Sequence, residues 1–432
     1  MKVIIIGAGL SGITLANSLS DTCDVTILEK GPENSYKIPE NIGFETKLAS
    51  VPTFCFGNGG TTNLWHNGLI PLDYSSIEDP TLRSILLRSK HFLDDAARVL
   101  GYTESEAITG LSGCFLSDSI ESKPLYYPNE YGCIKLNSNV RTYFDIQSFE
   151  IVGSYLLLSG VKLPFDKLIF CSGGLSTSIL LNKHFNLSHD GHFIDHPMGF
   201  VGKIKIKKKF LDDFSNVHEF RMDKGSIKSA LLIKLHGRTS AFYLRPAGSM
   251  SNSLAVNKYK SLLGASSGFS RFKKIFNINF FKKDILAEIF NKLFRVRIFP
   301  DTYSVMMVCD QKIRSNILSE NKAELIVDPS DLAIFKEQLK DLELKLAPFC
   351  ESINFEKNFD DNWLWSAAHH SGSLPAEKFV DENLQLKDHK NIYICDASIL
   401  SEHQFANTGL TLGSLALYLS DRLKNENCNS GC

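Results

Sequence analysis

The chain lacks the features that would place it in several large classes of protein. Its ten cysteines are scattered and include no Cys-x-x-Cys pair, so they indicate neither a zinc site nor a redox dithiol. No apolar run approaches the roughly 20 residues that a membrane-spanning helix requires. The formal net charge of -1 gives no overall field that would attract nucleic acid. We therefore expect a reduced, cytoplasmic protein that has no metal site and does not bind nucleic acid.

What the chain does have is length and an ordinary globular composition. With 432 residues, of which 43% are hydrophobic and 22% are charged, it can form two or more packed domains. Recognisable motifs lie towards the two ends, and residues 200–360 carry almost none. Function must therefore be inferred from a few short stretches and from their order.

The first thirty residues contain the clearest motif. The stretch "KVIIIGAGLSGITLANSLSDTCDVTILEK" predicts an apolar strand, a glycine turn, an amphipathic helix from about Leu10 to Leu19, and a second strand that ends at Glu29. Gly7 permits the tight turn, Gly9 lets the backbone approach a pyrophosphate, and Gly12 lets the helix pack closely on the strand. Glu29 is placed to accept hydrogen bonds from an adenosine ribose. This pattern indicates a bound dinucleotide without deciding between NAD and FAD.

Five further stretches combine glycines or polar residues with the ends of predicted strands. Taken alone, the loop at 54–73 is as consistent with a tight surface turn as with a ligand site, and His369 and His370 are better explained as turn residues with no catalytic role. The five stretches are "FCFGNGGTTNLWHNGLIPLD" (54–73), "FDKLIFCSGGLSTSILL" (165–181), "FIDHPMG" (193–199), "WSAAHHSGSLP" (365–375) and "NIYICDASILSEHQFANTGLTLGSLALYLSDRL" (391–423). The last of these predicts an apolar strand that ends at Asp396, a polar loop, and a helix that begins near Thr411.

In this order the stretches resemble the glucose-methanol-choline (GMC) family of FAD-dependent alcohol oxidoreductases, near its sugar-oxidising branch. The family pattern is matched by "GAGLSG" at 7–12, "GGTT" at 59–62, "CSGG" at 171–174, "DHP" at 195–197, "HHSGS" at 369–373, "DAS" at 396–398 and "NTGLT" at 407–411. The matches extend from residue 1 to about 423, and their joint order is far more specific than any one of them. The resemblance implies a flavoprotein that oxidises an alcohol to a carbonyl, with a sugar or a lipid-linked sugar among the candidate substrates.

The resemblance also implies which residues act on the alcohol. In the family, the first histidine of an HxxGT segment takes the hydroxyl proton of the alcohol while hydride passes to the flavin, and His369 fits that spacing with Gly372. Asn407 matches the His or Asn that hydrogen-bonds the same substrate oxygen, although the proline usual after that residue is absent. An imidazole that titrates near neutrality is suited to accept the proton. His370 is the alternative base if the local backbone is not extended.

The cofactor implied by the resemblance is FAD. Some sugar-oxidising members carry FAD on a histidine, but Leu64 occupies the matching position here, so we expect non-covalent binding. The implied cofactor-binding residues are Gly7, Gly9, Gly12, Glu29, Gly59, Gly60, Thr61, Thr62, Asn63, Gly173, Asp396, Ala397, Thr408 and Thr411. The electron acceptor stays open among oxygen, a quinone and another protein.

Two other functions remain open from the residues alone. One is an NAD-dependent dehydrogenase that uses the same N-terminal unit, although the downstream motifs argue against it. The other is a flavin-binding protein that does not oxidise alcohols. His66 and His403 also lie in loops on the ligand side, and we expect both to be structural.

The predicted fold class is α/β. It consists of a discontinuous, Rossmann-like FAD-binding domain and a second α+β substrate-binding domain built on an antiparallel sheet. We expect residues 1–75, 133–198 and 385–432 to form the FAD-binding domain, residues 199–384 the substrate-binding domain, and residues 76–132 a largely helical bridge.

The stretch at 271–299, "RFKKIFNINFFKKDILAEIFNKLFRVRIF", combines basic residues with phenylalanines. A basic amphipathic helix can lie on an anionic membrane surface, which would suit a lipid-linked substrate or a membrane quinone. A core-facing apolar stripe with a solvated basic back explains the same pattern more simply. Peripheral membrane contact through this stretch is therefore the second interpretation.

Overall fold

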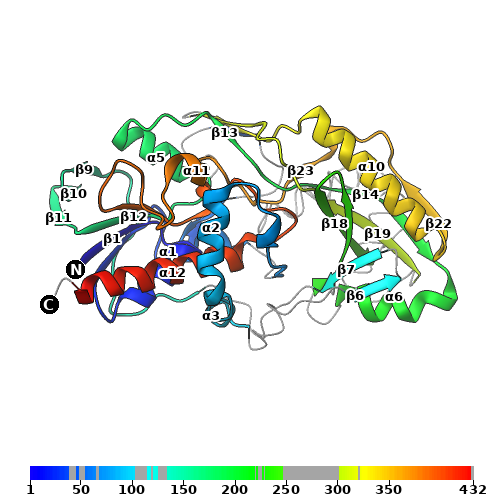
Figure 1. Cartoon of the computed structure of the whole chain (residues 1–432), viewed down its shortest axis with the longest axis horizontal. Helices are drawn as coiled ribbons and strands as arrows, with labels where there is room; N and C mark the ends of the chain where they lie inside the picture. Colours follow the sequence, from blue (N-terminus) through cyan, green and yellow to red (C-terminus); the bar gives the residue numbers. More distant parts are fainter. Residues whose placement is uncertain are drawn as a thin grey trace.

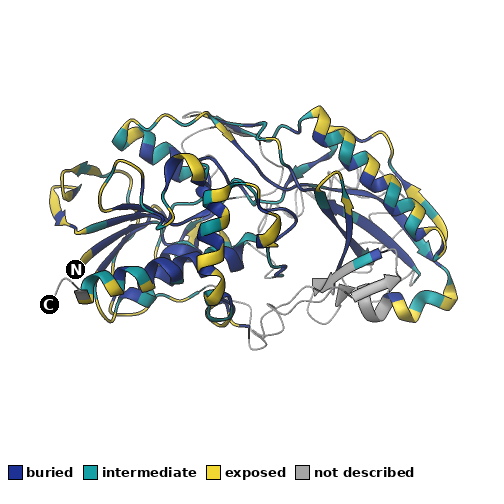
Figure 2. Cartoon of the chain, in the orientation of Figure 1, coloured by how far each residue is buried: buried dark blue, intermediate teal, exposed yellow. Residues whose placement is uncertain are grey.

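The computed structural model shows two lobes, each built around its own β-sheet (Figure 1). The structure describes residues 1–37, 45–47, 54–64, 68–102, 114–117, 120–124, 134–218, 220–221, 226–227, 229–246, 301–319 and 322–429. In both lobes the apolar strands are buried, whereas most of the helices keep an outer side in solvent (Figure 2).

A parallel sheet forms the core of the first lobe. Its five strands lie in the order β24 (Ile392–Ile394), β12 (Lys167–Phe170), β1 (Lys2–Ile6), β2 (Asp24–Leu28) and β8 (Arg141–Tyr143). Every neighbouring pair is parallel, and four of the five residues in both β1 and β2 are buried. This sheet confirms the predicted Rossmann-like arrangement, in which segments far apart in the sequence lie side by side.

Two helices from opposite ends of the chain pack together beside this sheet. They are α1 (Leu10–Leu19) and α12 (Thr408–Asn429), and the hydroxyls of Ser18 and Ser420 join them at 2.8 Å. The periodicity predicted the bounds of α1, whereas α12 begins at Thr408 rather than near Thr411. The other helices of this lobe are α2 (Pro80–Ser89), α3 (Leu93–Val99), α5 (Ser176–Phe185) and α11 (Ala376–Phe379), with 3-10 turns η1 (Gly60–Asn63), η2 (Tyr74–Ser76), η3 (Lys90–Phe92) and η7 (Ala397–Ile399).

An antiparallel sheet forms the core of the second lobe and confirms the predicted sheet type. Its strands lie in the order β22 (Cys350–Phe355), β14 (Pro197–Ile206), β19 (Thr302–Val308), β18 (Arg238–Pro246), β17 (Ser229–Leu235), β7 (Ile120–Pro124) and β6 (Cys114–Ser117), and β23 (Trp365–Ser366) pairs with β14. Helix α10 (Pro329–Leu346) lies along this sheet (Figure 1), with Phe335 and Leu342 in the shared core. Its start follows from the sequence, because the Asp328 side chain accepts a hydrogen bond from the Ser330 amide at 2.8 Å.

Shorter elements flank the two sheets. A four-stranded sheet, in the order β13–β20–β21–β4, brings together segments from three parts of the chain. The short elements are β3 (Tyr36–Lys37), β4 (Glu45–Lys47), β5 (Phe56–Gly57), β9 (Glu150–Val152), β10 (Tyr155–Leu158), β11 (Val161–Pro164), β13 (His192–Phe193), β15 (Phe220–Arg221), β16 (Ser226–Ile227), β20 (Asn316–Ser319), β21 (Lys322–Glu324), α6 (Leu211–His218), η4 (Lys208–Phe210) and η6 (Asp361–Trp363).

Two segments depart from the domain boundaries expected from the sequence. The bridge at 76–132 is not helical throughout, because β6 and β7 extend the antiparallel sheet from the edge of β17. Leu374 and Leu384 are buried in the core of the first lobe, so the chain returns to that lobe before residue 385. Segments this short carry too little periodicity to be assigned from the sequence.

The two lobes meet through an apolar contact. Ile70 and Phe405 of the first lobe pack with Leu232, Tyr243 and Val308, which lie on the antiparallel sheet. Among the helices of the described ranges, none has both the length and the hydropathy needed to cross a bilayer. The stretch at 271–299, for which membrane contact was an alternative expectation, lies outside the described residues.

Gly174, in the turn between β12 and α5, offers a direct test of this packing. A Cβ atom at this position would lie 1.9 Å from the carbonyl oxygen of His370, so the backbone would have to shift. We expect Gly174→Ala to lower the free energy of unfolding by about 3 kcal/mol, measured by chemical denaturation. Gly153→Ala is the control, because Gly153 has a φ of 58° but nothing within 4 Å of an added Cβ. Gly153→Ala should lower the free energy of unfolding by only about 1 kcal/mol. Equal decreases in the two variants would contradict the close contact between Gly174 and the His370 carbonyl.

Candidate active site

Three glycines shape the junction of β1 and α1, and the structure shows the tight turn at Gly7 and the close packing at Gly12 that the motif predicted. Gly7 has a φ of 107°, and a Cβ there would lie 2.5 Å from the carbonyl oxygen of Cys171. A Cβ on Gly12 would lie 2.0 Å from the Gly7 carbonyl oxygen, so this helix position also requires glycine. An added Cβ on Gly9, by contrast, would meet nothing within 4 Å. The backbone is therefore tightly packed on the strand side and open at the helix N-terminus.

Glu29 joins the two glycine-rich turns. Its carboxylate, in a residue only 6% exposed, accepts hydrogen bonds from the Ala8 amide at 2.8 Å, the Gly31 amide at 2.8 Å and the Gly57 amide at 3.0 Å. These bonds hold the carboxylate at the ends of β1 and β2. The predicted contact with an adenosine ribose would use the acceptor capacity that these three donors leave.

The second glycine-rich loop lies over the first. Gly59 has a φ of 91°, and its amide donates a hydrogen bond to the Ala8 carbonyl at 2.9 Å. A Cβ atom on Gly60 would lie 3.1 Å from the Cα atom of Gly9. Within η1 the Thr62 hydroxyl donates to the Gly59 carbonyl at 2.6 Å. Thr61 is exposed, and the Asn63 side chain donates to the Asn58 and Gly60 carbonyls at 3.0 and 2.8 Å. The structure thus brings the predicted loop residues 59–63 to the open side of α1.

Asp396 joins the turn at Gly173 to the loop that follows β24. Its carboxylate accepts hydrogen bonds from the Gly173 amide at 2.9 Å, the Thr177 hydroxyl, and the amide and hydroxyl of Ser398 at 2.9 and 2.6 Å. Burial raises the pKa of Asp396, and these donors oppose the shift. The neighbouring Ala397 carbonyl accepts from the Gly372 amide at 3.0 Å.

These features fit a bound dinucleotide. The first-turn amides of α1 have no intrahelical acceptor, and Gly9 supplies no side-chain cap. Such a helix N-terminus, with open space in front of it, is suited to a pyrophosphate. Gly173 likewise has a φ of 88° and no atom within 4 Å of an added Cβ.

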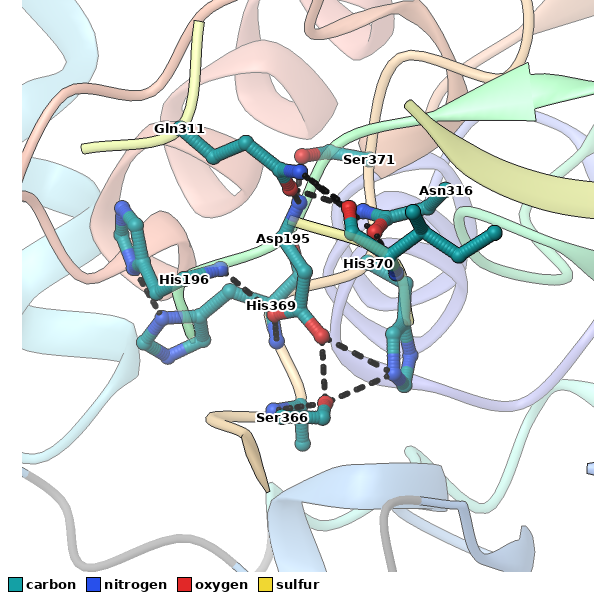
Figure 3. Close-up of polar contacts among 10 residues, drawn as sticks. Asp195, His196, Gln311, Asn316, Ser366, His369, His370 and Ser371 are labelled. Atoms are coloured by element: carbon teal, nitrogen blue, oxygen red, sulfur yellow. Dashed lines mark hydrogen bonds and ion pairs between the residues drawn. The ribbon is translucent and has the colours of Figure 1, made fainter. Parts of the chain in front are cut away.

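The carboxylate of Asp195 is the centre of the histidine-bearing site (Figure 3). Asp195 is 0% exposed, and its Oδ1 accepts from the amides of His196 at 2.7 Å and His369 at 3.0 Å. Its Oδ2 accepts from the Ser366 hydroxyl. Gln311 fixes the backbone from the other side, because its Oε1 accepts from the Asp195 amide at 3.0 Å. Burial raises the pKa of Asp195 to about 6, although its hydrogen bonds oppose the shift.

His370 lies on one side of Asp195. Its Nε2 is 3.0 Å from the Ser366 hydroxyl and 3.4 Å from Oδ2 of Asp195, and its ring stacks on Phe54 with centroids 4.8 Å apart. The Phe193 ring lies edge-on to the His370 ring, with centroids 5.9 Å apart. Burial lowers the pKa of His370 to about 3. This imidazole is therefore held neutral with Nε2 already engaged.

His369 projects to the opposite side of Asp195, as expected if the two side chains alternate (Figure 3). Its Nδ1 lies 2.7 Å from Nδ1 of His196, and the two rings meet edge-on. Nε2 of His196 hydrogen-bonds the Gln404 carbonyl oxygen. His403 packs against His196 with ring centroids 3.9 Å apart. Burial lowers the pKa of His369, while the charge of Asp195 opposes the shift.

Asn407 is fixed at the contact between the lobes. Its Oδ1 accepts from the Ile70 amide at 3.1 Å, and its own amide donates to the Ile70 carbonyl at 3.1 Å. Because the side-chain oxygen is engaged, the side-chain NH2 group is the part that can serve a ligand. Thr408 opens α12, and Thr411 is 2% exposed within its first turns.

A polar cavity of about 200 Å³ lies beside Gln404. Its lining includes Asp310, Glu402, Lys234 and Lys312. Burial raises the pKa of Asp310 to about 6. Among the described residues, no group of three or more His, Cys, Asp and Glu side chains is arranged to hold a metal ion.

Sequence reasoning gave no role to several residues of this site. Asp195 and His196 were quoted only as part of a family motif, and Ser366 only as part of the histidine stretch. A charged pair inside the apolar run "FIDHPMGF" is a signal that could have singled out the first two, since a buried charge needs partners. Gln311 and Gln404 act through long-range contacts that the sequence does not signal. His66 lies outside the described residues.

Comparisons with known proteins agree with this fold. A family model described as GMC oxidoreductase matches residues 322–416. An uncharacterized protein of Methanocaldococcus jannaschii is 24% identical over 415 residues, which cover 92% of this chain and 93% of that protein. Among solved structures, pyridoxine 4-oxidase from Mesorbium loti aligns with a TM-score of 0.57 at 12% identity and formate oxidase with 0.55 at 14% identity, each over 98% of both chains.

The fold, a Rossmann-like lobe beside an antiparallel-sheet lobe, is shared with these two oxidases, and residues 322–416 match the GMC oxidoreductase family model. The resemblance to the glucose-methanol-choline family is confirmed in sequence over residues 322–416 and in fold over the whole length of the chain.

Gly9 and Gly12 form a matched pair that tests the dinucleotide cradle. Gly9→Ala should leave the unfolding free energy of the apoprotein within about 1 kcal/mol of wild type, yet weaken FAD binding at least about tenfold, since the methyl group enters open space at the helix N-terminus. Gly12→Ala should instead destabilise the apoprotein by about 3 kcal/mol. Urea denaturation and FAD titration measure the two effects. Unchanged FAD affinity in Gly9→Ala would contradict the assigned pyrophosphate position.

His403 makes a pH-dependent contribution to stability. Burial lowers its pKa from the ordinary 6.5 to about 3, so the unfolded chain takes up the proton first as the pH falls. The stability present above pH 6.5 is lost progressively towards pH 3, and about 2 kcal/mol should be lost at pH 5. In His403→Phe, the decrease in unfolding free energy between pH 7 and pH 5 should be smaller by that amount. Urea denaturation at the two pH values would contradict this account if wild type and variant lost equal stability.

Proposed function

We propose that the protein oxidises an alcohol to a carbonyl with FAD, and that His369 is the general base. The observation that carries the proposal is the placement of His369, which Asp195 and His196 hold on the side of the site away from His370. The GMC-type family match supports alcohol-type oxidation in general. The pyridoxine 4-oxidase and formate oxidase neighbours share the fold.

The chemistry divides between cofactor and protein. FAD, when bound, would supply the hydride acceptor, so that the C–H and O–H bonds of the alcohol would break as the C=O bond forms. His369 takes the hydroxyl proton on the ring nitrogen that faces away from His196. Burial lowers the pKa of His369, which favours the neutral imidazole that a general base requires.

His370 is the weaker candidate for the base. Its Nε2 is engaged by Ser366 and lies near the Asp195 carboxylate, and its ring is enclosed by Phe54 and Phe193. These contacts support a role in holding the site together. Asn407 is proposed to donate its side-chain NH2 group to the substrate oxygen, because Ile70 already occupies its Oδ1.

We also propose a class of substrate, the mode of FAD binding, the electron acceptor and the location of the protein. The charged lining of the cavity beside Gln404 supports a hydroxyl-rich substrate such as a sugar. Leu64 offers no group for a covalent flavin link, which supports non-covalent FAD. Oxygen, a quinone or another protein would reoxidise the flavin. A cytoplasmic protein, with peripheral membrane contact through 271–299 as the alternative, remains our proposal for its location.

Replacement of His369 tests the proposed base. His369→Gln should bind FAD as wild type does, but anaerobic reduction of its flavin by a substrate alcohol should slow by about 10² to 10⁴-fold. His236→Gln is the matched control, because the His236 side chain is 63% exposed and pairs with Glu337. Stopped-flow bleaching of the flavin measures both variants. A His369→Gln enzyme that is reduced at the wild-type rate would show that the base is another group.

A further inference from the structure

We propose that His196 is a positioning residue that fixes the neutral tautomer of His369 with the proton on Nδ1, leaving the lone pair on Nε2. This inference rests on the proposed function, in which His369 is the base. It specifies which nitrogen accepts the substrate proton and which residue determines that choice. The argument uses three consecutive contacts, each of which limits the next.

The first contact is between His196 and Gln404. A backbone carbonyl oxygen can only accept a hydrogen bond, so Nε2 of His196 must carry the hydrogen that it donates to Gln404. Gln404 has a φ of 51°, and its side chain anchors the turn by donating to the Asp73 carbonyl at 2.9 Å and to the Ser76 hydroxyl. The acceptor is therefore held in place by contacts outside the histidine cluster.

The second contact is between His196 and His369. His196 is 0% exposed, and burial together with the neighbouring His403 and His369 lowers its pKa well below the ordinary value. A neutral imidazole with hydrogen on Nε2 has only a lone pair on Nδ1. The Nδ1–Nδ1 distance of 2.7 Å requires one hydrogen between the rings, and His369 must supply it. Nε2 of a neutral His369 is then unprotonated.

Among the residues that the structure describes, no contact other than that with His196 offers the ring of His369 a tautomer partner. Oδ1 of Asp195 is occupied by the backbone amides of His196 and His369, and Oδ2 faces Ser366 and His370 on the other side. Nδ1 of His403 faces the Gln404 carbonyl at the longer distance of 3.4 Å. His196 is thus the ring contact that determines the tautomer of His369. The same contact stabilises the imidazolium that forms once Nε2 takes a proton, because Nδ1 remains a donor.

Two nearly isosteric variants separate this role from simple packing. His196→Asn places a side-chain oxygen near the position of Nδ1 and can still accept from His369, whereas His196→Leu has a similar shape and no acceptor. Nitrogen-15 NMR of the histidine-labelled, FAD-loaded enzyme reports which ring nitrogen carries the hydrogen. The His369 signals are assigned by their loss in His369→Gln.

We expect His369 to have hydrogen on Nδ1 in wild type and in His196→Asn, and to change to the Nε2–H tautomer in His196→Leu. Flavin reduction by a substrate alcohol should slow about 10- to 100-fold in His196→Leu and be largely rescued in His196→Asn. An Nε2–H tautomer of His369 in wild type would overturn the proposal without any variant. So would an unchanged tautomer in His196→Leu.

The result also separates this inference from the proposed function. If the tautomer follows His196 but His369→Gln keeps the wild-type rate of flavin reduction, the positioning is correct and the base is wrong. If His369→Gln loses the rate but the tautomer does not depend on His196, the base is correct and the positioning is wrong. Should His196→Leu not fold, the wild-type spectrum and His196→Asn still decide the question.

Discussion

The buried carboxylate of Asp195 is the interaction on which the histidine-bearing site depends. It lies just before β14 and, through its two oxygens, holds the backbone of His369 and the side chain of Ser366. No lysine or arginine pairs with it among the contacts of the described residues, so hydrogen bonds offset the cost of burying its charge. That cost appears as the raised pKa of Asp195, about 6. The two adjacent histidines are directed to opposite sides of one fixed acceptor.

The cofactor half of the site depends on close packing more than on charge. Gly7 and Gly12 leave no room for side chains where α1 meets β1, while Gly9 leaves the helix N-terminus open. Glu29 and Asp396 each tie loops together from the ends of β2 and β24, at the edge of the parallel sheet where such folds bind nucleotides. The residues that we propose to bind the cofactor therefore also hold this lobe together.

How far the sequence predicted this structure depends on the range of each interaction. The bounds of α1 and the close packing at Gly7 and Gly12 followed from periodicity and local sterics, which a short stretch of sequence contains. The family resemblance indicated His369 and the order of the motifs. The roles of Asp195, His196 and Gln404 were not predictable, because they arise only when segments near 195, 369 and 404 come together. The strands β6 and β7 were missed for the same reason, since the edge of β17 supplies their hydrogen-bond partners.

We propose that this chain binds FAD and reduces it with an alcohol. The most direct measurement is the visible absorption spectrum of the purified protein, before and after denaturation, followed by anaerobic addition of sugars and other alcohols. The account predicts flavin bands that pass into the supernatant on denaturation and that are bleached by at least one alcohol in the native protein. A colourless protein that also fails to take up added FAD would contradict it.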